Sequence, residues 1–444
     1  GLETGGSHSA SFGRYDAWAL LWEVPRPDGT SPSARVGHAI ASLDEQLYVY
    51  GGASGGRPLG EVYVHNTRTS YWEKAIPDME EVHGDPSCSA PMPIVGHAMA
   101  AIDVAPGSQL AKDNFKFVGQ KLLVFGGGDG RKASRDSWLI DVKTLVTRQL
   151  VARGTPPTER VGHAACLVRG RMFYVFGGFV RKLGYMFDLH CLDLQSVMWS
   201  QVAVGGVVPD GRINHSLAAL EKGAGEKRAK NSGVLYLFGG AFKGVPFGDL
   251  YRVDEKHKEW EKLEPSGLTP EPRSGHSANF IGRRMYVYGG QCGGGRWLNE
   301  LVVLDADGLL WSRPRTSAPP RARSQHAAAI VGTRLLIFGG AQGGTFLSDL
   351  SILDVASAST TAPLPSAGTL AKPPPAADAL SSAVAGASSS TVIVPVGEEG
   401  VPAPKMKKGV TFGASSKMAK AVLLLGGPKA GAAGEGEGEA AAEE

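Results

Sequence analysis

The chain has 444 residues, 42% of them hydrophobic, which is enough apolar material for a large buried core. Its 46 basic and 43 acidic residues give a net charge of +3, so overall charge favours neither nucleic acid nor an anionic membrane as a partner. The four cysteines lie far apart and form no C-x-x-C pair, which argues against a disulfide framework and a structural zinc site. The longest strongly apolar run, residues 421–425, is too short to cross a bilayer.

The first predicted element is a strand around Trp22. We expect residues 1–14, which precede it, to be flexible. Residues 17–24 contain two tryptophans among Ala, Leu and Val, and a Pro-rich stretch then leads to Arg35. Trp260 leads to Arg273 in the same way later in the chain. This parallel predicts that residues 17–24 correspond to the last strand of a repeated unit.

An aromatic-Gly-Gly triplet then occurs six times. The triplets are Tyr50-Gly51-Gly52, Phe125-Gly126-Gly127, Phe176-Gly177-Gly178, Phe238-Gly239-Gly240, Tyr288-Gly289-Gly290 and Phe338-Gly339-Gly340. Successive triplets are separated by 75, 51, 62, 50 and 50 residues. Each one ends an apolar run rich in β-forming residues, such as residues 47–49, which is typical of a buried strand. A glycine pair after a strand allows positive φ angles and close backbone packing.

Three further landmarks recur in step with the triplets. A histidine precedes each triplet: His38, His97, His163, His215, His276 and His326. Five of these histidines have an arginine three residues earlier, and the second repeat has Ile94 there: Arg35, Arg160, Arg212, Arg273 and Arg323. A carboxylate follows each second glycine by nine or ten residues: Glu61, Asp136, Asp188, Asp249, Glu300 and Asp349. Four repeats then end on a tryptophan: Trp72, Trp199, Trp260 and Trp311.

Each repeat therefore predicts four short strands, and such a unit cannot bury both of its faces alone. Radial packing of the units buries these faces and leaves only short edges. The pattern resembles the kelch repeat, matched through six units from about Arg35 to Asp354. The resemblance implies an all-β, six-bladed kelch β-propeller, which we assign to residues 15–355. Because the sixth repeat has Thr360 in place of tryptophan, we expect the strand around Trp22 to complete blade six and close the ring.

Three insertions break the 50-residue period. Residues 76–93 lengthen the connection between blades one and two, and residues 103–119 and 221–232 lengthen the first hairpins of blades two and four. The last insertion is polar and basic, so we expect it to be solvated. Long insertions on a repeat scaffold often form a binding face, and an idle loop is the alternative.

Residues 356–444 are dominated by Ala, Pro, Ser and Gly, and Phe412 is their single aromatic residue. This composition cannot bury enough apolar surface to offset chain entropy, so we expect a mostly disordered, low-complexity tail. Lys408, Val410 and Phe412 fit the basic-x-Val-x-Phe motif that docks type-1 protein phosphatase, a short pattern that also arises by chance. Residues 416–425 predict a brief helix that would present apolar side chains to a partner.

The repeated histidines are the first candidates for a metal site, but each occupies the equivalent place in its own blade. They should therefore surround a ring rather than converge, and we expect each imidazole to be hydrogen-bonded in a structural role. The Arg35-type and Glu61-type residues should pair at one rim. No nucleophile elbow, phosphate loop or nucleophile–base pair occurs, and the site patterns of the copper oxidase and iron-dependent specifier proteins with kelch propellers have no counterpart. We expect no catalytic residue, metal, cofactor or small-molecule substrate.

The loops after the glycine pairs should all lie on one face. They carry basic residues interleaved with aromatic ones: Arg57, Arg131, Lys132, Phe179, Arg181, Lys182, Tyr185, Phe242, Lys243, Arg296, Trp297 and Phe346. Arginine and large aromatic side chains dominate protein-binding hot spots, so we interpret these residues as a partner-binding surface. A solvated rim is the alternative. The partner would present an acidic or phosphorylated surface, and nucleic acid is less favoured because no nucleic-acid module is recognisable.

The expected function is that of a non-catalytic scaffold or adaptor for protein–protein interaction. The resemblance to kelch propellers implies a subunit of a larger assembly, cytoskeletal and ciliary ones included, in a cytoplasmic setting and without a membrane partner. One alternative is the substrate-recognition module of a ubiquitin ligase, although no BTB domain is visible. Two others are a targeting subunit of type-1 phosphatase, acting through the tail motif, and an enzyme with an unrecognised site.

Overall fold

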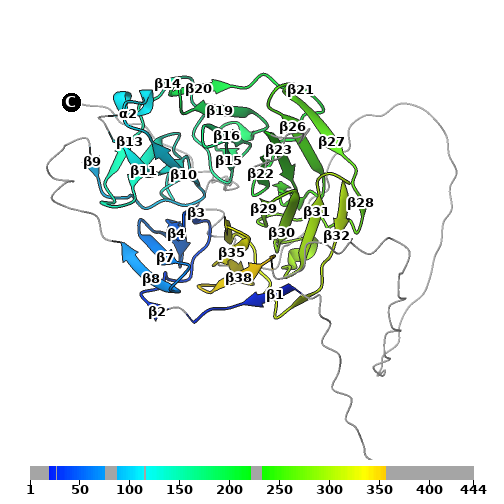
Figure 1. The fold of residues 1–444 in the computed structure, drawn as a ribbon. Helices are drawn as coiled ribbons and strands as arrows, with labels where there is room; N and C mark the ends of the chain where they lie inside the picture. The colour runs from blue at the N-terminus through cyan, green and yellow to red at the C-terminus, as the bar shows by residue number, and fades with distance from the viewer. Residues whose placement is uncertain (1–19, 27, 76–87, 115–116, 222–232, 357–444) are drawn as a thin grey trace, which may run out of the picture. The chain divides into compact units, whose positions relative to one another are not determined.

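The computed structural model describes residues 20–26, 28–75, 88–114, 117–221 and 233–356. Within these residues, six five-stranded sheets surround a central axis as the blades of a propeller (Figure 1). The same residues include the short helix α2 (Gln109–Asp113) and the 3-10 turn η1 (Gly293–Gly295). The predicted all-β, six-bladed propeller is confirmed. The N-terminal residues 1–14 and the tail from residue 357 onward, with its phosphatase motif, lie outside the described residues.

Four antiparallel strands build each blade from the axis outward. The innermost strands follow the histidines: β3 (Ala39–Leu43), β10 (Ala98–Val104), β15 (Ala164–Val168), β22 (Ser216–Leu220), β29 (Ser277–Ile281) and β34 (Ala327–Val331). The second strands lead into the glycine pairs: β4 (Gln46–Tyr50), β11 (Gly119–Phe125), β16 (Met172–Phe176), β23 (Val234–Phe238), β30 (Arg284–Tyr288) and β35 (Arg334–Phe338).

The outer half of each blade follows the carboxylate positions. The third strands are β7 (Val62–Asn66), β12 (Ser137–Asp141), β19 (Leu189–Asp193), β26 (Leu250–Asp254), β31 (Leu301–Asp305) and β38 (Leu350–Asp354). The fourth strands are β8 (Tyr71–Ala75), β13 (Thr147–Gln149), β20 (Met198–Gln201), β27 (Glu259–Leu263), β32 (Leu310–Ser312) and, in blade six, β1 (Leu20–Glu23).

The N-terminal strand β1 closes the ring. It pairs antiparallel with β38 of blade six, with Trp22 opposite Leu353. The Trp22 side chain is buried, and its ring centroid lies 5.0 Å from that of Tyr288 in blade five. The prediction of closure by the strand around Trp22 is therefore confirmed, and the pairing leaves blade six with no missing strand.

A fifth short strand joins successive blades. The segment that leaves one blade runs parallel to the outer strand of the next: β2 (Asp28–Gly29), β14 (Arg153–Gly154), β21 (Gly205–Gly206), β28 (Ser266–Gly267) and β33 (Thr316–Ser317). Blade two differs, because β9 (Cys88–Ser89) runs antiparallel to β13. Gly206 shows why glycine recurs here: its φ is +75°, and a Cβ atom would lie 2.2 Å from the carbonyl oxygen of Trp260.

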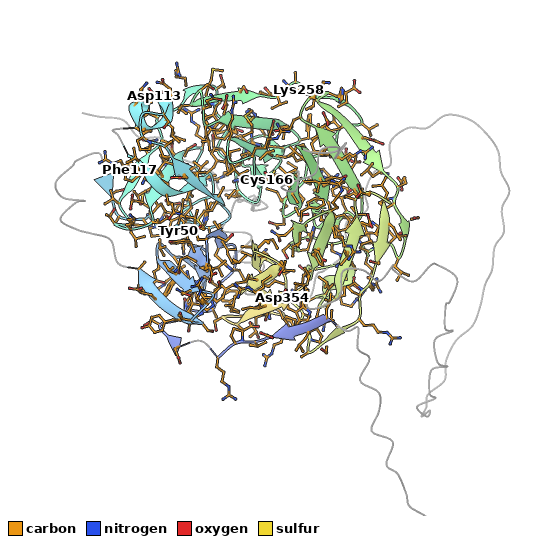
Figure 2. The ribbon with its side chains drawn as sticks, viewed as in Figure 1. Tyr50, Asp113, Phe117, Cys166, Lys258 and Asp354 are labelled. Atoms are coloured by element: carbon orange, nitrogen blue, oxygen red, sulfur yellow. The ribbon has the colours of Figure 1, made fainter. Side chains whose placement is uncertain are left out.

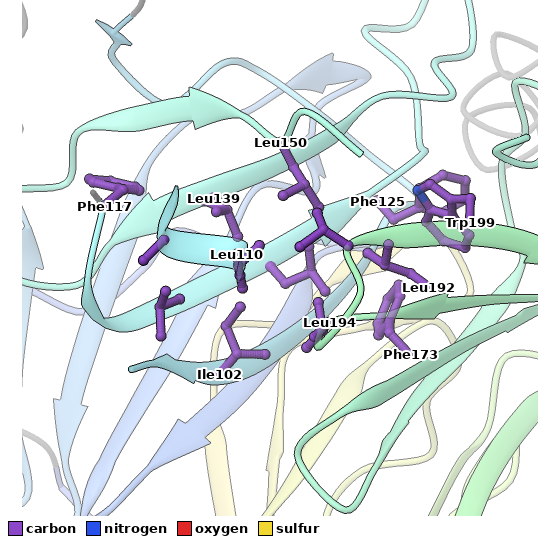
Figure 3. Packing of buried hydrophobic residues seen from close by; sticks show 14 of the residues in the cluster. Ile102, Leu110, Phe117, Phe125, Leu139, Leu150, Phe173, Leu192, Leu194 and Trp199 are labelled. Carbon is purple, nitrogen blue, oxygen red and sulfur yellow. The ribbon is translucent and has the colours of Figure 1, made fainter. Parts of the chain in front are cut away.

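Apolar side chains fill the space between neighbouring blades. Each of six buried clusters lies at one of the six blade–blade interfaces. Figure 3 shows the cluster between blades two and three, where Trp199 packs 5.0 Å from the ring of Phe125. Four other interfaces repeat this contact between the outer tryptophan of one blade and the triplet aromatic of the preceding blade. The repeated aromatic residues are thus explained by packing between blades.

The insertion at residues 103–119 packs onto the propeller where it is described. Ser108 caps α2 by accepting a hydrogen bond from the backbone N–H of Ala111. Leu110 and Phe117 are buried in the cluster between blades two and three (Figure 3). This segment therefore serves as an extension of the core. Most of the other two insertions, residues 76–87 and 222–232, lies outside the described residues.

Candidate functional site

The hairpins that follow the glycine pairs surround the mouth of a cavity on the propeller axis. In each blade the first residue of the hairpin forms a β-bridge with the residue two positions before the histidine, so all six hairpins share one face. We call this surface the loop face, and it comprises residues 53–58, 128–133, 179–185, 241–246, 291–297 and 341–346. Four of its hairpins are paired strands: β5–β6 (Ala53–Ser54, Arg57–Pro58), β17–β18 (Phe179–Val180, Gly184–Tyr185), β24–β25 (Ala241–Phe242, Val245–Pro246) and β36–β37 (Ala341–Gln342, Thr345–Phe346).

The axial cavity has a volume of about 270 Å³ and is lined by residues of all six blades. Figure 2 shows side chains packed between the sheets, with Cys166 on the inner strand β15 beside the central opening and Lys258 at the perimeter. The hairpins of blades one to three contribute Pro58, Gly130 and Tyr185 to the cavity wall. The cavity is therefore continuous with the loop face.

A closed ring of backbone hydrogen bonds surrounds this cavity. The residue before each histidine donates its N–H to the carbonyl of its counterpart in the preceding blade, at 2.7–3.2 Å. The six members are Gly37, Gly96, Gly162, Asn214, Gly275 and Gln325. All six have positive φ, including the two that are not glycine. The bond from Gly37 to Gln325 joins the first and last blades independently of β1.

Each histidine lies over the glycine pairs of two blades. A Cβ atom on Gly126 would come within 2.6 Å of the imidazole of His163, and one on Gly127 within 2.8 Å of the Cβ atom of His97. The same relation recurs around the ring and ends with Gly339 beneath His38. The glycines are therefore required because the histidines occupy the space that a side chain would need.

The histidines are buried and neutral. Burial, with a smaller contribution from nearby arginines for some of them, lowers the pKa of His38, His97, His163 and His276 to about 3. His38 hydrogen-bonds the carbonyl of Phe338, and two more histidines bond serine hydroxyls in the preceding blade. Both ring nitrogens of His97 lack a hydrogen-bond partner among the described residues, so the expected hydrogen bonding does not hold for every histidine of the ring. No group of three metal-ligating side chains occurs among those residues.

The arginines three residues before the histidines are buried in ion pairs. Each of the five side chains is 0% exposed and contacts the carboxylate predicted for its own blade: Arg35–Glu61, Arg160–Asp188, Arg212–Asp249, Arg273–Glu300 and Arg323–Asp349. Each guanidinium also donates to the carbonyl of the first glycine of its pair. The predicted pairing is thus present in all five blades that have the arginine. Because these guanidinium groups are buried and paired within the blades, they are not available to a partner.

The basic residues predicted to bind a partner are mostly unpaired. Six of them are exposed and form no ion pair with any described residue: Arg57, Arg131, Lys132, Arg181, Lys182 and Lys243. Arg296 is also exposed, but its guanidinium contacts Glu271. The loop face therefore carries a set of free cations above the buried, neutralised arginines.

The aromatic residues predicted with them are more buried than the sequence suggested. Phe242 is 38% exposed, whereas Phe179, Tyr185, Trp297 and Phe346 are half-buried. The reason in blades three and four is that the rings pack on one another. Phe179 lies 5.3 Å from Tyr185, and Tyr185 lies 4.8 Å from Phe242 in the next blade.

Sequence reasoning missed three exposed apolar side chains beside these rings. Leu183 is 64% exposed, Phe187 is 61% exposed and Val245 is 65% exposed. Aligning the six hairpins residue by residue would have revealed them. The position of Phe187 is occupied by Gly60 in blade one and by small or polar residues in the others.

A second cavity of about 400 Å³ lies between blades three and four, away from the loop face. At its mouth, Glu255 accepts a hydrogen bond from Tyr174 and pairs with Arg169 at 3.3 Å. Burial raises the pKa of Cys191, which lines this cavity, to about 12, so its thiol stays protonated. Because Glu255, Tyr174 and Arg169 already bond one another, they are less available to a partner than the unpaired cations of the loop face. The loop face is therefore the better candidate for contact with a partner.

Comparison with known proteins identifies the family. The chain matches the model described as the KLHDC2/KLHL20/DRC7 Kelch-repeats domain over residues 2–224 and 228–400. It is 29% identical to Acyl-CoA-binding domain-containing protein 4 of Arabidopsis thaliana over 296 residues, which cover 66% of this chain and 40% of that protein. It is 33% identical to Host cell factor 1 of Homo sapiens over 279 residues, which cover 59% of this chain and 12% of that protein. The chain thus spans less than half the length of these relatives.

The architecture of the structure agrees with this match. The six blades follow the repeat that the family model describes. No helix in the described part of the chain is long and apolar enough to span a membrane. The chain belongs to the kelch-repeat family.

Proposed function

We propose that this protein is a non-catalytic interaction scaffold or adaptor that docks another protein on its loop face. The observation that carries the proposal is the division between two sets of basic residues. The five arginines inside the blades are buried and paired, whereas six cations on the loop face are exposed and unpaired. Unpaired surface cations beside aromatic rings contribute little to folding but suit recognition of an acidic surface.

The scaffold supports this role because its closure does not depend on the hairpin tips. The ring of backbone hydrogen bonds, the pairing of β1 with β38 and the clusters between blades hold the propeller. The tips can therefore vary in sequence at little cost in stability. The partner we propose presents an acidic or phosphorylated surface, and the protein would act as a subunit of a larger assembly, cytoskeletal and ciliary ones included.

The test is affinity capture with the full chain and two charge-reversed variants. The loop-face variant carries Arg131→Glu, Arg181→Glu, Lys182→Glu and Lys243→Glu. The control variant carries the same change at four exposed lysines away from the loop face: Lys112, Lys143, Lys256 and Lys258. Both variants change the net charge equally, and unchanged circular dichroism and melting temperature verify that each is folded.

Proteins captured by the parent and the control but lost by the loop-face variant support the proposal. Proteins retained by all three chains contradict it and would move docking to the perimeter, the opposite face or the tail. Arg296 is left unchanged because its contact with Glu271 would be broken, which would confuse loss of binding with a local rearrangement.

Phosphatase targeting is a second candidate, carried by the motif of Lys408, Val410 and Phe412 in the tail. It predicts that Phe412→Ala abolishes co-precipitation of type-1 phosphatase while the loop-face variant retains it. Substrate recognition for a ubiquitin ligase is compatible with docking on the loop face and would show as ligase subunits among the proteins captured.

A further inference from the structure

The six hairpins of the loop face differ in the side chains at their tips. Blades one, five and six place consecutive glycines there, at residues 55–56, 293–295 and 343–344. Blades three and four instead carry large apolar residues: Phe179, Leu183, Tyr185, Phe242 and Val245. We call these five residues the anchor patch. The loop face is therefore uneven: blades three and four carry five large apolar residues, whereas blades five and six carry one half-buried aromatic residue each, Trp297 and Phe346.

The rings of the anchor patch form a continuous row across the two blades. Tyr185 of β18 stands between Phe179 of β17 and Phe242 of β24, at centroid distances of 5.3 and 4.8 Å and with tilted or edge-on geometry. Phe179 and Tyr185 also line the axial cavity. The row thus extends from the cavity mouth outward and is held in place by its own contacts.

The aliphatic members beside this row are exposed to solvent. Leu183 and Val245 are 64% and 65% exposed, so a partner that covers them removes apolar surface from water, which favours binding. Exposed apolar residues elsewhere, such as Leu21, Met198 and Leu268, lie on separate strands or connections of different blades. A grouped apolar surface rimmed by polar residues is characteristic of an interaction site.

The charged side chains within the two hairpins of the anchor patch are all basic, and the exposed Asp210 lies next to Gly211, which packs against the backbone of Tyr185. Arg181, Lys182 and Lys243 are exposed and unpaired, and the Lys243 ammonium lies 5.2 Å from the centre of the Phe242 ring. Residues 179–185 and 241–247 contain no acidic side chain. Arg181 is the only arginine in these two hairpins, so they lack the clustered guanidinium groups that favour a phosphate. Complementarity therefore favours carboxylates next to apolar side chains.

We infer that the anchor patch holds an unphosphorylated segment of the partner in which an aromatic or large aliphatic side chain is flanked by Asp or Glu. This inference rests on the proposed function. It restricts the docking surface to blades three and four and the ligand to an apolar side chain flanked by carboxylates. Apolar burial supplies most of the affinity, and the cations supply orientation and association rate.

The experiment selects unphosphorylated random peptides, displayed on phage, against the immobilised full chain. Enriched peptides are then synthesised with a fluorescent label and their affinities measured by polarisation. The expected peptides combine Phe, Trp or Leu with neighbouring Asp or Glu. Phe242→Ala and Val245→Asp should each weaken binding about tenfold or more. Gln342→Ala, at the exposed position of blade six that corresponds to Phe242 in blade four, is the matched control and should leave the affinity unchanged.

Three results would overturn the inference. The first is enrichment of peptides without acidic residues, and the second is equal loss of affinity in the Phe242→Ala and Gln342→Ala variants. The third is self-association of the full chain in sedimentation that Phe242→Ala abolishes, because a second copy would then cover the patch. Equal loss of affinity in the Phe242→Ala and Gln342→Ala variants, together with loss in the four-residue charge-reversed variant, leaves the proposed function standing. Full affinity in the charge-reversed variant would count against the proposed function itself.

Discussion

Mild acid is expected to unfold the propeller, because its six ring histidines are buried as neutral groups. Burial lowers the pKa of His38, His97, His163 and His276 to about 3, from an ordinary value of 6.5. Below pH 6.5 the unfolded chain binds protons that the folded chain excludes. The stability conferred by a neutral, buried imidazole is therefore fully present above pH 6.5 and is lost as the pH falls towards 3.

The size of this effect follows from the four pKa values. At about pH 5, each of these histidines lies roughly 1.5 units below its unfolded pKa, which costs about 2 kcal/mol per group. The four together reduce the free energy of unfolding by about 8 kcal/mol, as much as the whole stability of many domains. Carboxylates such as Asp193, whose pKa is lowered to about 2 chiefly by Arg171, add their loss only at lower pH.

The assay is denaturant unfolding followed by tryptophan fluorescence at a series of pH values between 7 and 4.5. Between pH 6 and 5, the free energy of unfolding should fall by about 1.4 kcal/mol per pH unit for each buried histidine. His163→Asn should reduce this slope by the contribution of one histidine, about 1.4 kcal/mol per pH unit, even if the substitution also changes the free energy of unfolding at neutral pH. A free energy that stays flat between pH 6.5 and 5 would refute the assignment of the histidines as buried and neutral.

Three further predictions concern the closure and the blades. Arg160→Ala removes a fully buried guanidinium from Asp188, which still contacts His190, and from the Gly177 carbonyl. It should cost about 3–5 kcal/mol in denaturant unfolding, whereas Arg131→Ala on the loop face should change stability by less than about 0.5 kcal/mol. Trp22→Ala should cost about 3–5 kcal/mol and make the N-terminal strand susceptible to limited proteolysis, and equal resistance would contradict closure by β1. Gly206→Ala should lower the melting temperature far more than Gly244→Ala, because both have positive φ but only the first would clash with backbone.

The sequence predicted the parts of the fold that depend on contacts within one repeat. The pairs Arg160–Asp188 and Arg212–Asp249 were predictable because the start of the first strand and the start of the third strand meet at the same rim in every blade. The closing strand was predictable because blade six lacked a tryptophan that the N-terminus supplied.

The features that the sequence did not predict join one blade to the next through the backbone. The ring around the axis uses only main-chain N–H and C=O groups. A glycine before every histidine would have indicated it, but Asn214 and Gln325 occupy two of the six positions. The parallel strands such as β21 were also missed, because they too are backbone contacts between neighbouring blades. Their signal in the sequence is a Gly-x-x-Pro-x-x-Arg spacing, as in residues 206–212. The aromatic row was missed because contacts between hairpins of different blades depend on the closed ring.

Hydrogen–deuterium exchange of the full chain, alone and with a captured partner, tests the central claim that the loop face is the docking surface. The short hairpins β17–β18 and β24–β25 present exposed tips and should exchange quickly in the free protein. If the loop face is the docking surface, the partner slows exchange at residues 179–185 and 241–246 and leaves the turns near Lys143 and Lys258 unchanged. Protection confined to those turns or to the tail, with the hairpins unaffected, would contradict it.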